Sequence, residues 1–193
     1  LYFSHWPDAE TSHEQTLGAY DPLVRSGRVR VLGASNYTAE MVRAAEETSV
    51  IKTLPRYEVL QPRYNLYDRE EFDALREVVL EEELGTIVYF SLASGFLTGK
   101  YRNKSDFSKS QRGGGMEQYL DAKGEAILAA LDTVAAANDA TPAEVSLAWL
   151  VAQKGVTAPI ASATSVEQVK SLAKGVRLKL SDGDLKTLTN AGH

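Results

Sequence analysis

The stretch 86-TIVYFSLASGFLTGKYR-102 lies in the middle of the 193-residue chain and joins a buried strand to a polar loop. The apolar run Thr86–Tyr89 has the composition of a strand that is buried on both faces. Small and hydroxylated side chains follow it, then two glycines and the bases Lys100 and Arg102. A loop of this composition, at the end of a buried strand, is suited to a negatively charged ligand.

The same alternation of apolar runs and helical patterns extends through the chain. Short apolar runs predict strands at Leu1–Ser4, Val29–Leu32, Arg56–Leu60, Thr86–Tyr89 and Thr157–Ile160. Helical patterns lie at Ser12–Ser26, Ala39–Ser49, Arg69–Glu83, Asp121–Asn138, Pro142–Lys154 and Val166–Ala173. Strands that alternate with helices run parallel, because each crossover has to return over a face of the sheet. The pattern therefore predicts an α/β fold.

Helix boundaries carry signals of their own. Thr141, Pro142 and Glu144 fit an N-cap, a first helical residue and the third position of a capping box. Ser181 opens a last short helix in a similar way, and Gly27 is placed to end the first helix. The polar stretch 103–118 contains three consecutive glycines, and we expect it to form a mobile loop.

Two architectures fit these elements, a doubly wound sheet and a (β/α)8 barrel. No G-x-G-x-x-G motif follows any predicted strand, which weakens the first. Five strand–helix units in 193 residues match the roughly 30 residues per unit of a (β/α)8 barrel, whose usual length is about 250 residues. We expect residues 1–193 to form a single domain, a partial (β/α)8 (TIM) barrel that lacks roughly the first three units.

Composition excludes several classes of function. The net charge of −5 argues against a nucleic-acid surface, and no apolar run approaches the roughly 20 residues that span a bilayer. Without cysteine, the chain has no disulfides, no thiolate chemistry and no cysteine-based zinc site. Its three histidines make a His-rich metal site unexpected. We expect a cytoplasmic protein with no metal, no nucleic-acid partner and no membrane partner.

Polar side chains follow the predicted strands in order. His5 follows the first strand, Ser35 and Asn36 the second, Gln61 the third, and Ser162 and Thr164 the fifth. Each has a structural interpretation: a lone histidine is commonly a structural hydrogen-bonding group, a Ser-Asn pair a helix cap, and Lys100 a surface charge. Their recurrence at successive strand ends favours a functional site at the carboxyl edge of the sheet.

These segments resemble the aldo-keto reductase family. The run 1-LYFSHWPD-8 is similar to the histidine signature of that family, and 23-LVRSGRVRVLGASNY-37 is similar to its second signature. The segments Gln61–Arg69, Ser91–Arg102 and Ile160–Gln168 continue the similarity, which covers nearly the whole chain. The resemblance is greatest to bacterial members with a long loop after the seventh strand. This cofactor-side loop corresponds here to residues 92–118, and we expect it to be partly mobile.

The resemblance implies NAD(P)H-dependent reduction of aldehydes or ketones to alcohols. His5 would orient the substrate carbonyl. Ser35, Asn36 and Gln61 would hold the nicotinamide carboxamide, and Tyr89 would stack on the nicotinamide ring. The residues that would wrap the pyrophosphate are Ser91, Leu92, Ser94, Gly95, Leu97, Thr98 and Lys100. Ser162, Thr164 and Gln168 would lie at the adenosine end, near the start of a helix that favours an anion.

Two features depart from the family pattern. The family usually has a basic residue near the 2′-phosphate and an Asn four residues beyond the position matched by Gln168. This segment has Leu172 there, with only Lys170 and Lys174 nearby, so NADP is expected from the resemblance and NAD is possible. The family's catalytic Tyr, Lys and Asp come from the first three units, and neither Tyr37 nor Tyr64 matches that motif. The 193-residue chain alone is therefore predicted to be inactive.

The expected partners are a small-molecule carbonyl substrate and the missing N-terminal segment of the same protein. A partial barrel exposes strand edges, which predicts that the isolated chain associates. Two alternatives remain. One is a non-catalytic dinucleotide-binding protein, such as a regulatory or channel-associated subunit, and the other is a barrel enzyme of another class, for example a phosphate-binding isomerase or aldolase.

Overall fold

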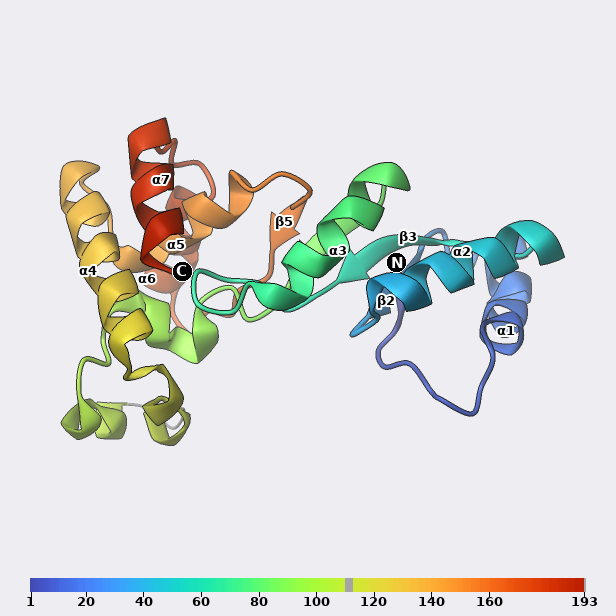
Figure 1. Ribbon diagram of the computed structural model, residues 1–193, viewed down its shortest axis with the longest axis horizontal. Coiled ribbons are helices and arrows are strands. Elements are labelled where there is room, and N and C mark those ends of the chain that lie inside the picture. Colours follow the sequence, from blue (N-terminus) through green and yellow to red (C-terminus); the bar gives the residue numbers. More distant parts are fainter. Residues whose placement is uncertain (110–112, 193) are drawn as a thin grey trace. The chain divides into compact units, whose positions relative to one another are not determined.

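The computed structural model describes residues 1–109 and 113–192, which divide into two compact units. The first unit comprises Leu1–Arg63 and Glu70–Val88. The second comprises Tyr64–Arg69 and the described residues from Tyr89 onward. Figure 1 shows the chain coloured from blue at the N-terminus to red at the C-terminus. The expectation of a single domain stays a prediction.

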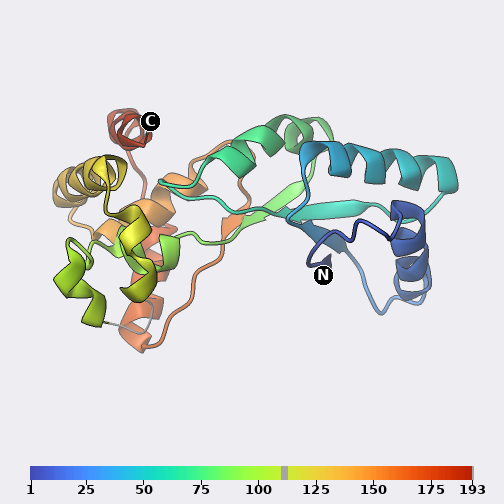
Figure 2. The same cartoon turned by 60° about the horizontal axis from the view of Figure 1, so that its bottom comes forward.

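The first unit is a parallel sheet with helical crossovers, as the sequence predicts. Its elements are β1 (Tyr2–Ser4), α1 (His13–Arg25), β2 (Leu32–Ser35), α2 (Ala39–Lys52), β3 (Tyr57–Gln61), α3 (Glu70–Glu81) and β4 (Gly85–Val88). Strands that are consecutive in the chain pair in parallel, with Ser4 opposite Ala34 and Ser35 opposite Gln61. Figure 2 shows α2 and α3 along one face of these strands. The carboxyl ends of β1, β2 and β3 therefore meet at one edge.

Local side-chain chemistry sets the helix boundaries of this unit. The Ser12 side chain accepts from the Gln15 backbone N–H, and the Gln15 side chain accepts from the Ser12 backbone in return, which forms a capping box at the start of α1. Gly27 ends this helix with a φ of 73°, as predicted. Helix α2 begins after Thr38, whose hydroxyl accepts from the Met41 N–H at 3.3 Å.

The second strand corrects the sequence prediction. We expected it at Val29–Leu32, because β-branched residues favour strands, but it runs from Leu32 to Ser35 and is buried throughout. A Cβ added at Gly33 would lie 2.3 Å from Cε1 of Phe3, so close packing against the neighbouring strand requires a small residue here. The prediction was wrong because packing, and not intrinsic strand preference, decides this position.

The second unit is mainly helical. It contains the 3-10 helices η1 (Ala93–Thr98), η2 (Lys104–Lys109), η3 (Gly113–Gly115) and η4 (Glu117–Tyr119), the strand β5 (Ala158–Pro159), and the helices α4 (Ala122–Ala137), α5 (Pro142–Val151), α6 (Val166–Gly175) and α7 (Asp182–Ala191). Figure 1 shows α4, α5, α6 and α7 packed together. The predicted capping boxes at Thr141 and Ser181 are both confirmed.

The predicted mobile loop contains regular structure where it is described. The short helices η2 and η3 lie within the stretch 103–118 and η4 begins in it, while residues 110–112 fall outside the described residues. Short polar segments of this kind form 3-10 turns because each needs few hydrogen bonds to close. The mobility of this loop stays a prediction.

The buried Arg69 holds the segment Tyr64–Arg69 within the second unit. The Arg69 guanidinium donates to the backbone carbonyl oxygens of Thr189 at 2.7 Å and Leu188 at 3.2 Å, near the end of α7. The Arg69 guanidinium also lies 5.0 Å from the ring centroid of Trp149, whose Nε1–H donates to the Thr189 hydroxyl at 3.0 Å. A cation at the carboxyl end of a helix is favourable, because the unpaired carbonyl groups there are partly negative.

We predict that Gly33→Ala destabilises the protein by about 1–3 kcal/mol, because the added methyl group meets the Phe3 ring in a packed interior. Gly18→Ala in α1 is the matched control, since nothing lies within 4 Å of the added Cβ. Alanine favours the helix over glycine by up to about 1 kcal/mol, so this variant should be at least as stable as the wild type. Chemical denaturation measures both, and equal stability of the two variants would contradict the packing account.

Candidate functional site

In the first unit, the side chains of Ser35 and Asn36 make hydrogen bonds at the carboxyl ends of three strands, two of them to backbone carbonyl oxygens. The Ser35 hydroxyl donates to the Gln61 carbonyl oxygen at 2.9 Å. The Asn36 side-chain amide donates to the Ser35 Oγ at 3.1 Å and to the His5 carbonyl oxygen at 2.9 Å. Four of the predicted site residues thus lie at one edge of the sheet, linked through two side chains.

The backbone of Asn36 adopts the left-handed region, with a φ of 62°. Asparagine tolerates this conformation better than most residues, because its short polar side chain bonds to nearby backbone groups. The helix cap that follows is Thr38, so the interpretation of the Ser-Asn pair as a helix cap is wrong. The pair instead connects strand ends.

His5 is exposed and borders a cavity of about 320 Å³. Aromatic residues of the same unit line this cavity, among them Trp6, His13 and Tyr37. The ring centroids of His5 and Trp6 lie 5.8 Å apart. The cavity reaches the lower end of the volume range of small-molecule sites, and an imidazole at its edge can donate a hydrogen bond to a ligand oxygen.

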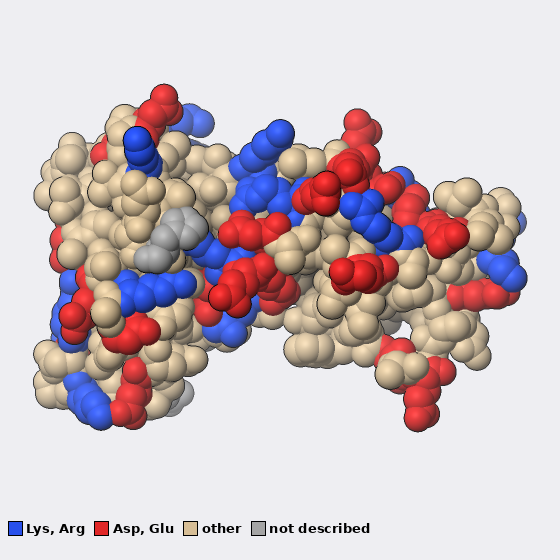
Figure 3. Space-filling view, in the orientation of Figure 1, with Lys and Arg blue, Asp and Glu red and all other residues tan. Residues whose placement is uncertain are grey.

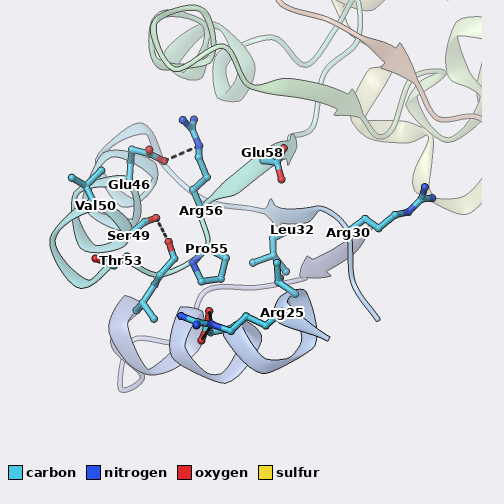
Figure 4. A pocket seen from close by; sticks show the side chains of 13 residues that line it. Arg25, Arg30, Leu32, Glu46, Ser49, Val50, Thr53, Pro55, Arg56 and Glu58 are labelled. Carbon is cyan, nitrogen blue, oxygen red and sulfur yellow. Dashed lines mark hydrogen bonds and ion pairs between the residues drawn. The ribbon is translucent and has the colours of Figure 1, made fainter. Parts of the chain in front are cut away.

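A larger hollow of about 670 Å³ lies at the opposite, amino-terminal ends of β2 and β3 (Figure 4). Arg25 and Arg56 line it, but each pairs with a carboxylate of the same hollow: Arg25 with Asp21 at 2.6 Å, and Arg56 with Glu46 at 3.2 Å. None of the predicted site residues lines it. Ligands of parallel α/β folds bind at the carboxyl ends of the strands, which favours the smaller cavity.

Acidic and basic side chains on α2 and α3 pair with one another. Figure 3 shows acidic and basic side chains side by side over α2 and α3. The ion pairs there include Arg43 with Glu81 at 2.7 Å. Exposed pairs of this kind contribute little to stability, and they leave a surface of mixed sign over these two helices.

In the second unit, the loop after Tyr89 is tightly coiled. Phe90, Ala93 and Ser94 have φ values of 59°, 46° and 55°, and Gly95 has a φ of 103°. The Ala93 N–H donates to the Phe90 carbonyl oxygen at 2.7 Å, and the Gly95 N–H to the Leu92 carbonyl oxygen at 2.8 Å. Turns with such left-handed residues form concave backbone surfaces, a type that binds anions.

Lys100 folds back over this loop. A Cβ added at Gly95 would lie 3.5 Å from both Cε and Nζ of Lys100, so the ammonium group lies next to the tightest part of the turn. Lys100 is exposed, and its Nζ is 4.9 Å from the ring centroid of Tyr101. Arg102, by contrast, is bound to Asp132 by two hydrogen bonds of 2.9 and 2.7 Å. Of these two bases, Lys100 is placed to meet an anion, whereas Arg102 ties the loop to α4.

The other predicted loop residues differ in exposure. Ser91 and Leu97 are buried, so their side chains belong to the interior and only their backbone could reach a ligand. Tyr89, Leu92, Ser94 and Thr98 are half-buried. The Thr98 hydroxyl donates to the Gly95 carbonyl oxygen at 2.7 Å and closes the turn around Gly95.

Ser162, Thr164 and Gln168 lie at or just before the start of α6. Ser162 is exposed. The Thr164 N–H donates to the Gln168 Oε1 at 2.8 Å, and the Gln168 N–H donates to the hydroxyl of Ser165, the N-cap, at 3.2 Å. Gln168 therefore also organises the helix start, a role that the sequence did not indicate.

Helix α6 is held by the buried carboxylate of Glu144. The Thr141 N–H donates to Glu144 at 3.0 Å, the Ser171 hydroxyl at 2.9 Å, and Lys174 lies 3.2 Å away. Burial by itself would raise the pKa of Glu144, but these hydrogen bonds and the ammonium group lower it below its ordinary value. Lys174 also donates to the Asp139 carbonyl oxygen at 2.8 Å, so its charge already has partners.

Sequence reasoning missed a hydroxyl cluster that begins at the residue before His5 and that we define as Ser4, Tyr20, Tyr37 and Tyr57. The Ser4 Oγ lies 2.7 Å from the Tyr57 Oη and 3.0 Å from the Tyr20 Oη, and the Tyr37 and Tyr57 hydroxyls are 3.3 Å apart. Burial raises the pKa of the Tyr57 phenol, which keeps this hydroxyl neutral and able to donate. The four positions are far apart in the chain and form no motif.

Comparison with known proteins establishes the family of this chain. The model of the aldo/keto reductase family matches residues 1–192. The chain therefore belongs to the aldo-keto reductase family. It is 27% identical, with a TM-score of 0.75, to the crystal structure of the thermostable aldo-keto reductase Tm1743 with the inhibitor epalrestat, covering 99% of this chain and 59% of that one. The partial (β/α)8 barrel predicted from the sequence is confirmed by this similarity.

Two curated relatives come from a yeast and a bacterium. The chain is 28% identical over 195 residues to the aldo-keto reductase yakc [NADP(+)] of Schizosaccharomyces pombe, covering 99% of this chain and 56% of that protein. It is 28% identical over 201 residues to protein tas of Escherichia coli, covering 94% of this chain and 58% of that protein. The chain thus spans somewhat more than half the length of these two relatives.

Among the described residues, no helix is both long and apolar enough to cross a membrane.

We predict that Glu144→Gln destabilises the protein by about 1–3 kcal/mol at pH 7, because charged hydrogen bonds are lost at a buried position. A carboxyl group whose pKa is lowered by folding stabilises the protein above its unfolded pKa of about 4.3. That contribution is lost as the pH falls through the folded pKa. The stability difference between wild type and variant, measured by denaturation from pH 7 to pH 3, should therefore shrink below about pH 4. A constant difference across this range would contradict the role of the charge.

Proposed function

We propose that the complete protein reduces aldehydes or ketones to alcohols with NAD(P)H. The observation that carries this proposal is the hydrogen-bonded set of His5, Ser35, Asn36 and Gln61 at the carboxyl edge of the first unit. Family membership supports the same reaction class. A small-molecule carbonyl compound is the proposed substrate.

The chemistry of the site residues fits a nicotinamide dinucleotide. A hydroxyl and two amides, from Ser35, Asn36 and Gln61, suit the donors and acceptors of a carboxamide. The left-handed turn around Gly95 and the adjacent Lys100 ammonium group suit a pyrophosphate. Tyr89 is proposed to stack on the nicotinamide ring, and Ser162, Thr164 and Gln168 to lie at the adenosine end. When bound, NAD(P)H would supply the hydride.

His5 is proposed to orient the substrate. Its imidazole is exposed at the edge of the cavity, where an N–H can donate to a carbonyl oxygen. A hydrogen bond to this oxygen withdraws electron density from the carbonyl carbon and stabilises the negative charge that develops on the oxygen. Trp6 and Tyr37 give the cavity an apolar wall against which the rest of the substrate can pack.

The proton for the developing alkoxide is proposed to come from a residue outside this chain segment. Tyr64 is buried with its ring centroid 5.4 Å from that of Trp149, and the Tyr37 hydroxyl faces Tyr57 at 3.3 Å. Neither matches the family's catalytic Tyr motif. Residues 1–193 alone are therefore expected to lack turnover, since loss of a positioned acid costs about 10²–10⁴ in rate. The isolated chain is also expected to associate, because β1 presents a strand edge.

NADP is the proposed cofactor, with NAD as the other candidate. The name of the Schizosaccharomyces pombe relative includes NADP(+). In this chain Lys170 is exposed on α6, whereas Lys174 pairs with Glu144. Lys170 is therefore the better placed of these two lysines to meet a 2′-phosphate.

We predict that Lys100→Ala in the complete protein raises the NADPH dissociation constant roughly 5- to 150-fold, the equivalent of about 1–3 kcal/mol for a lost charge-assisted hydrogen bond. Lys104→Ala is the matched control: it removes a charge from the same loop, but Lys104 pairs with Glu117 at the surface. Fluorescence titration with NADPH measures both. Equal affinities of the two variants would remove Lys100 from the site.

We predict that the complete protein oxidises NADPH in the presence of a reactive aldehyde, and that His5→Ala lowers this rate. The isolated 193-residue chain, verified by mass, should show no appreciable turnover. Absorbance at the NADPH band follows both reactions. Binding of NADPH without any turnover by the complete protein would instead indicate a non-catalytic dinucleotide-binding subunit. Robust turnover by the isolated chain would show that the acid has been misassigned.

A further inference from the structure

The hydroxyl cluster includes Ser4, the residue immediately before His5, which carries the proposed substrate contact. Ser4 is the last residue of β1, and His5 follows it. Ser4, Tyr37 and Tyr57 are each at least nine-tenths buried, so their hydroxyls have few competing water molecules. The cluster brings together β1, α1, the segment after β2 and the start of β3.

The direction of the Ser4 side chain bears on the direction of His5. Successive side chains of an extended strand point to opposite faces, so rotation of β1 about its axis turns both residues together. The hydrogen bonds that Ser4 Oγ shares with the hydroxyls of Tyr57, at 2.7 Å, and Tyr20, at 3.0 Å, oppose that rotation. On the next residue, the Asn36 amide holds the His5 carbonyl oxygen at 2.9 Å. The backbone that bears the imidazole is therefore fixed at two consecutive residues.

The imidazole itself is exposed, in contrast to this fixed backbone. Its ring centroid lies 5.8 Å from that of Trp6, which is itself 66% exposed. An exposed side chain on a free strand end would sample many directions. Most of the order available to His5 thus comes from the backbone and from the groups that hold it.

We propose that Ser4 and Tyr57 are positioning residues, which set the direction of the His5 imidazole through the hydroxyl cluster. The proposal rests on the proposed carbonyl reduction for its kinetic consequence, although the orientation of His5 can be measured without it. Because Ser4 Oγ is shared between two tyrosine hydroxyls, its loss and the loss of the Tyr57 hydroxyl should not act additively.

The chain offers a closely matched control in Ser49. Ser4 and Ser49 are both 6% exposed, both belong to the first unit, and the Ser49 hydroxyl makes a hydrogen bond of 2.6 Å to the Leu54 carbonyl oxygen. Ser49 lies near the end of α2, beside the larger hollow at the amino-terminal strand ends. Each variant therefore removes one buried serine hydroxyl, which lies next to His5 in Ser4→Ala and away from the carboxyl edge in Ser49→Ala.

The experiment uses the complete protein with Ser4→Ala, Tyr57→Phe, the double variant and Ser49→Ala. Steady-state kinetics with NADPH and a small aldehyde give kcat, fluorescence titration gives the NADPH dissociation constant, and carbon–proton NMR spectra give the His5 imidazole resonances. We expect kcat to fall roughly 10- to 100-fold in Ser4→Ala and Tyr57→Phe, since displacement of a reacting group by about 1 Å can cost about 10²-fold. The double variant should be little worse than either single variant, and NADPH affinity should stay within about twofold of wild type.

The His5 resonances should shift or broaden in Ser4→Ala and Tyr57→Phe and remain unchanged in Ser49→Ala. If Ser4→Ala matches Ser49→Ala in both kcat and the His5 resonances, the proposal is wrong. A fall in kcat with unchanged His5 resonances and weakened NADPH binding would also overturn it, because that pattern indicates general structural damage. If no variant, wild type included, reduces an aldehyde, the proposed function fails, while the resonances still decide whether the cluster positions His5.

Discussion

The side-chain amide of Asn36 is the constraint on which the carboxyl edge of the first unit depends. It donates to the His5 carbonyl oxygen and to the Ser35 hydroxyl, and Ser35 in turn donates to the Gln61 carbonyl oxygen. Side-chain hydrogen bonds are thereby added to the sheet pairing where three strands end. The left-handed backbone of Asn36 is part of this arrangement, since its φ of 62° costs energy that local hydrogen bonds must offset. An edge fixed in this way is organised before a ligand binds, which reduces the ordering cost of binding.

The loop of the second unit is organised by a comparable set of local bonds. The Asp106 carboxylate accepts the backbone N–H groups of Arg102 at 2.7 Å and Asn103 at 3.1 Å. A hydrogen bond from Lys109, together with these N–H groups, lowers the pKa of Asp106 to about 2. Asp132 holds the Arg102 guanidinium through two hydrogen bonds. The carboxylates of Asp106 and Asp132 thus fix the segment after Lys100. The Lys100 ammonium group stays exposed next to Gly95.

The sequence predicted a helix or strand correctly where a local signal, such as a capping residue, decides its boundary. Thr141, Pro142 and Glu144 specify a helix start through the side chain that caps it, so α5 begins at Pro142 as predicted. The second strand was misplaced, because the valines around residue 30 favour a strand while Phe3 decides which residues fit next to β1. That information lies in a contact between residues 30 positions apart. The same limitation applies to Arg69, whose partners at 188 and 189 no local pattern indicates.

In the candidate site, too, local sequence order predicted some features, while others depend on contacts between distant residues. The order of polar residues at strand ends predicted that His5, Asn36 and Gln61 would lie along one edge, because parallel strands end together. The hydroxyl cluster was not predictable, since Ser4, Tyr20, Tyr37 and Tyr57 meet only when a strand, a helix and two further segments pack. The dual role of Gln168, which also organises the start of α6, depends equally on the folded geometry.

The central proposal is that, in the complete protein, a nicotinamide dinucleotide contacts the strand ends around Ser35 and Asn36 in the first unit and the loop 91–100 in the second. Hydrogen–deuterium exchange of the complete protein, with and without saturating NADPH, tests it most directly. Slower exchange of backbone amides within 33–36 and 91–100, with helix α7 (Asp182–Ala191) unchanged, is the predicted result. Unchanged exchange in both segments at saturating NADPH, or protection confined to other parts of the chain, would contradict the account.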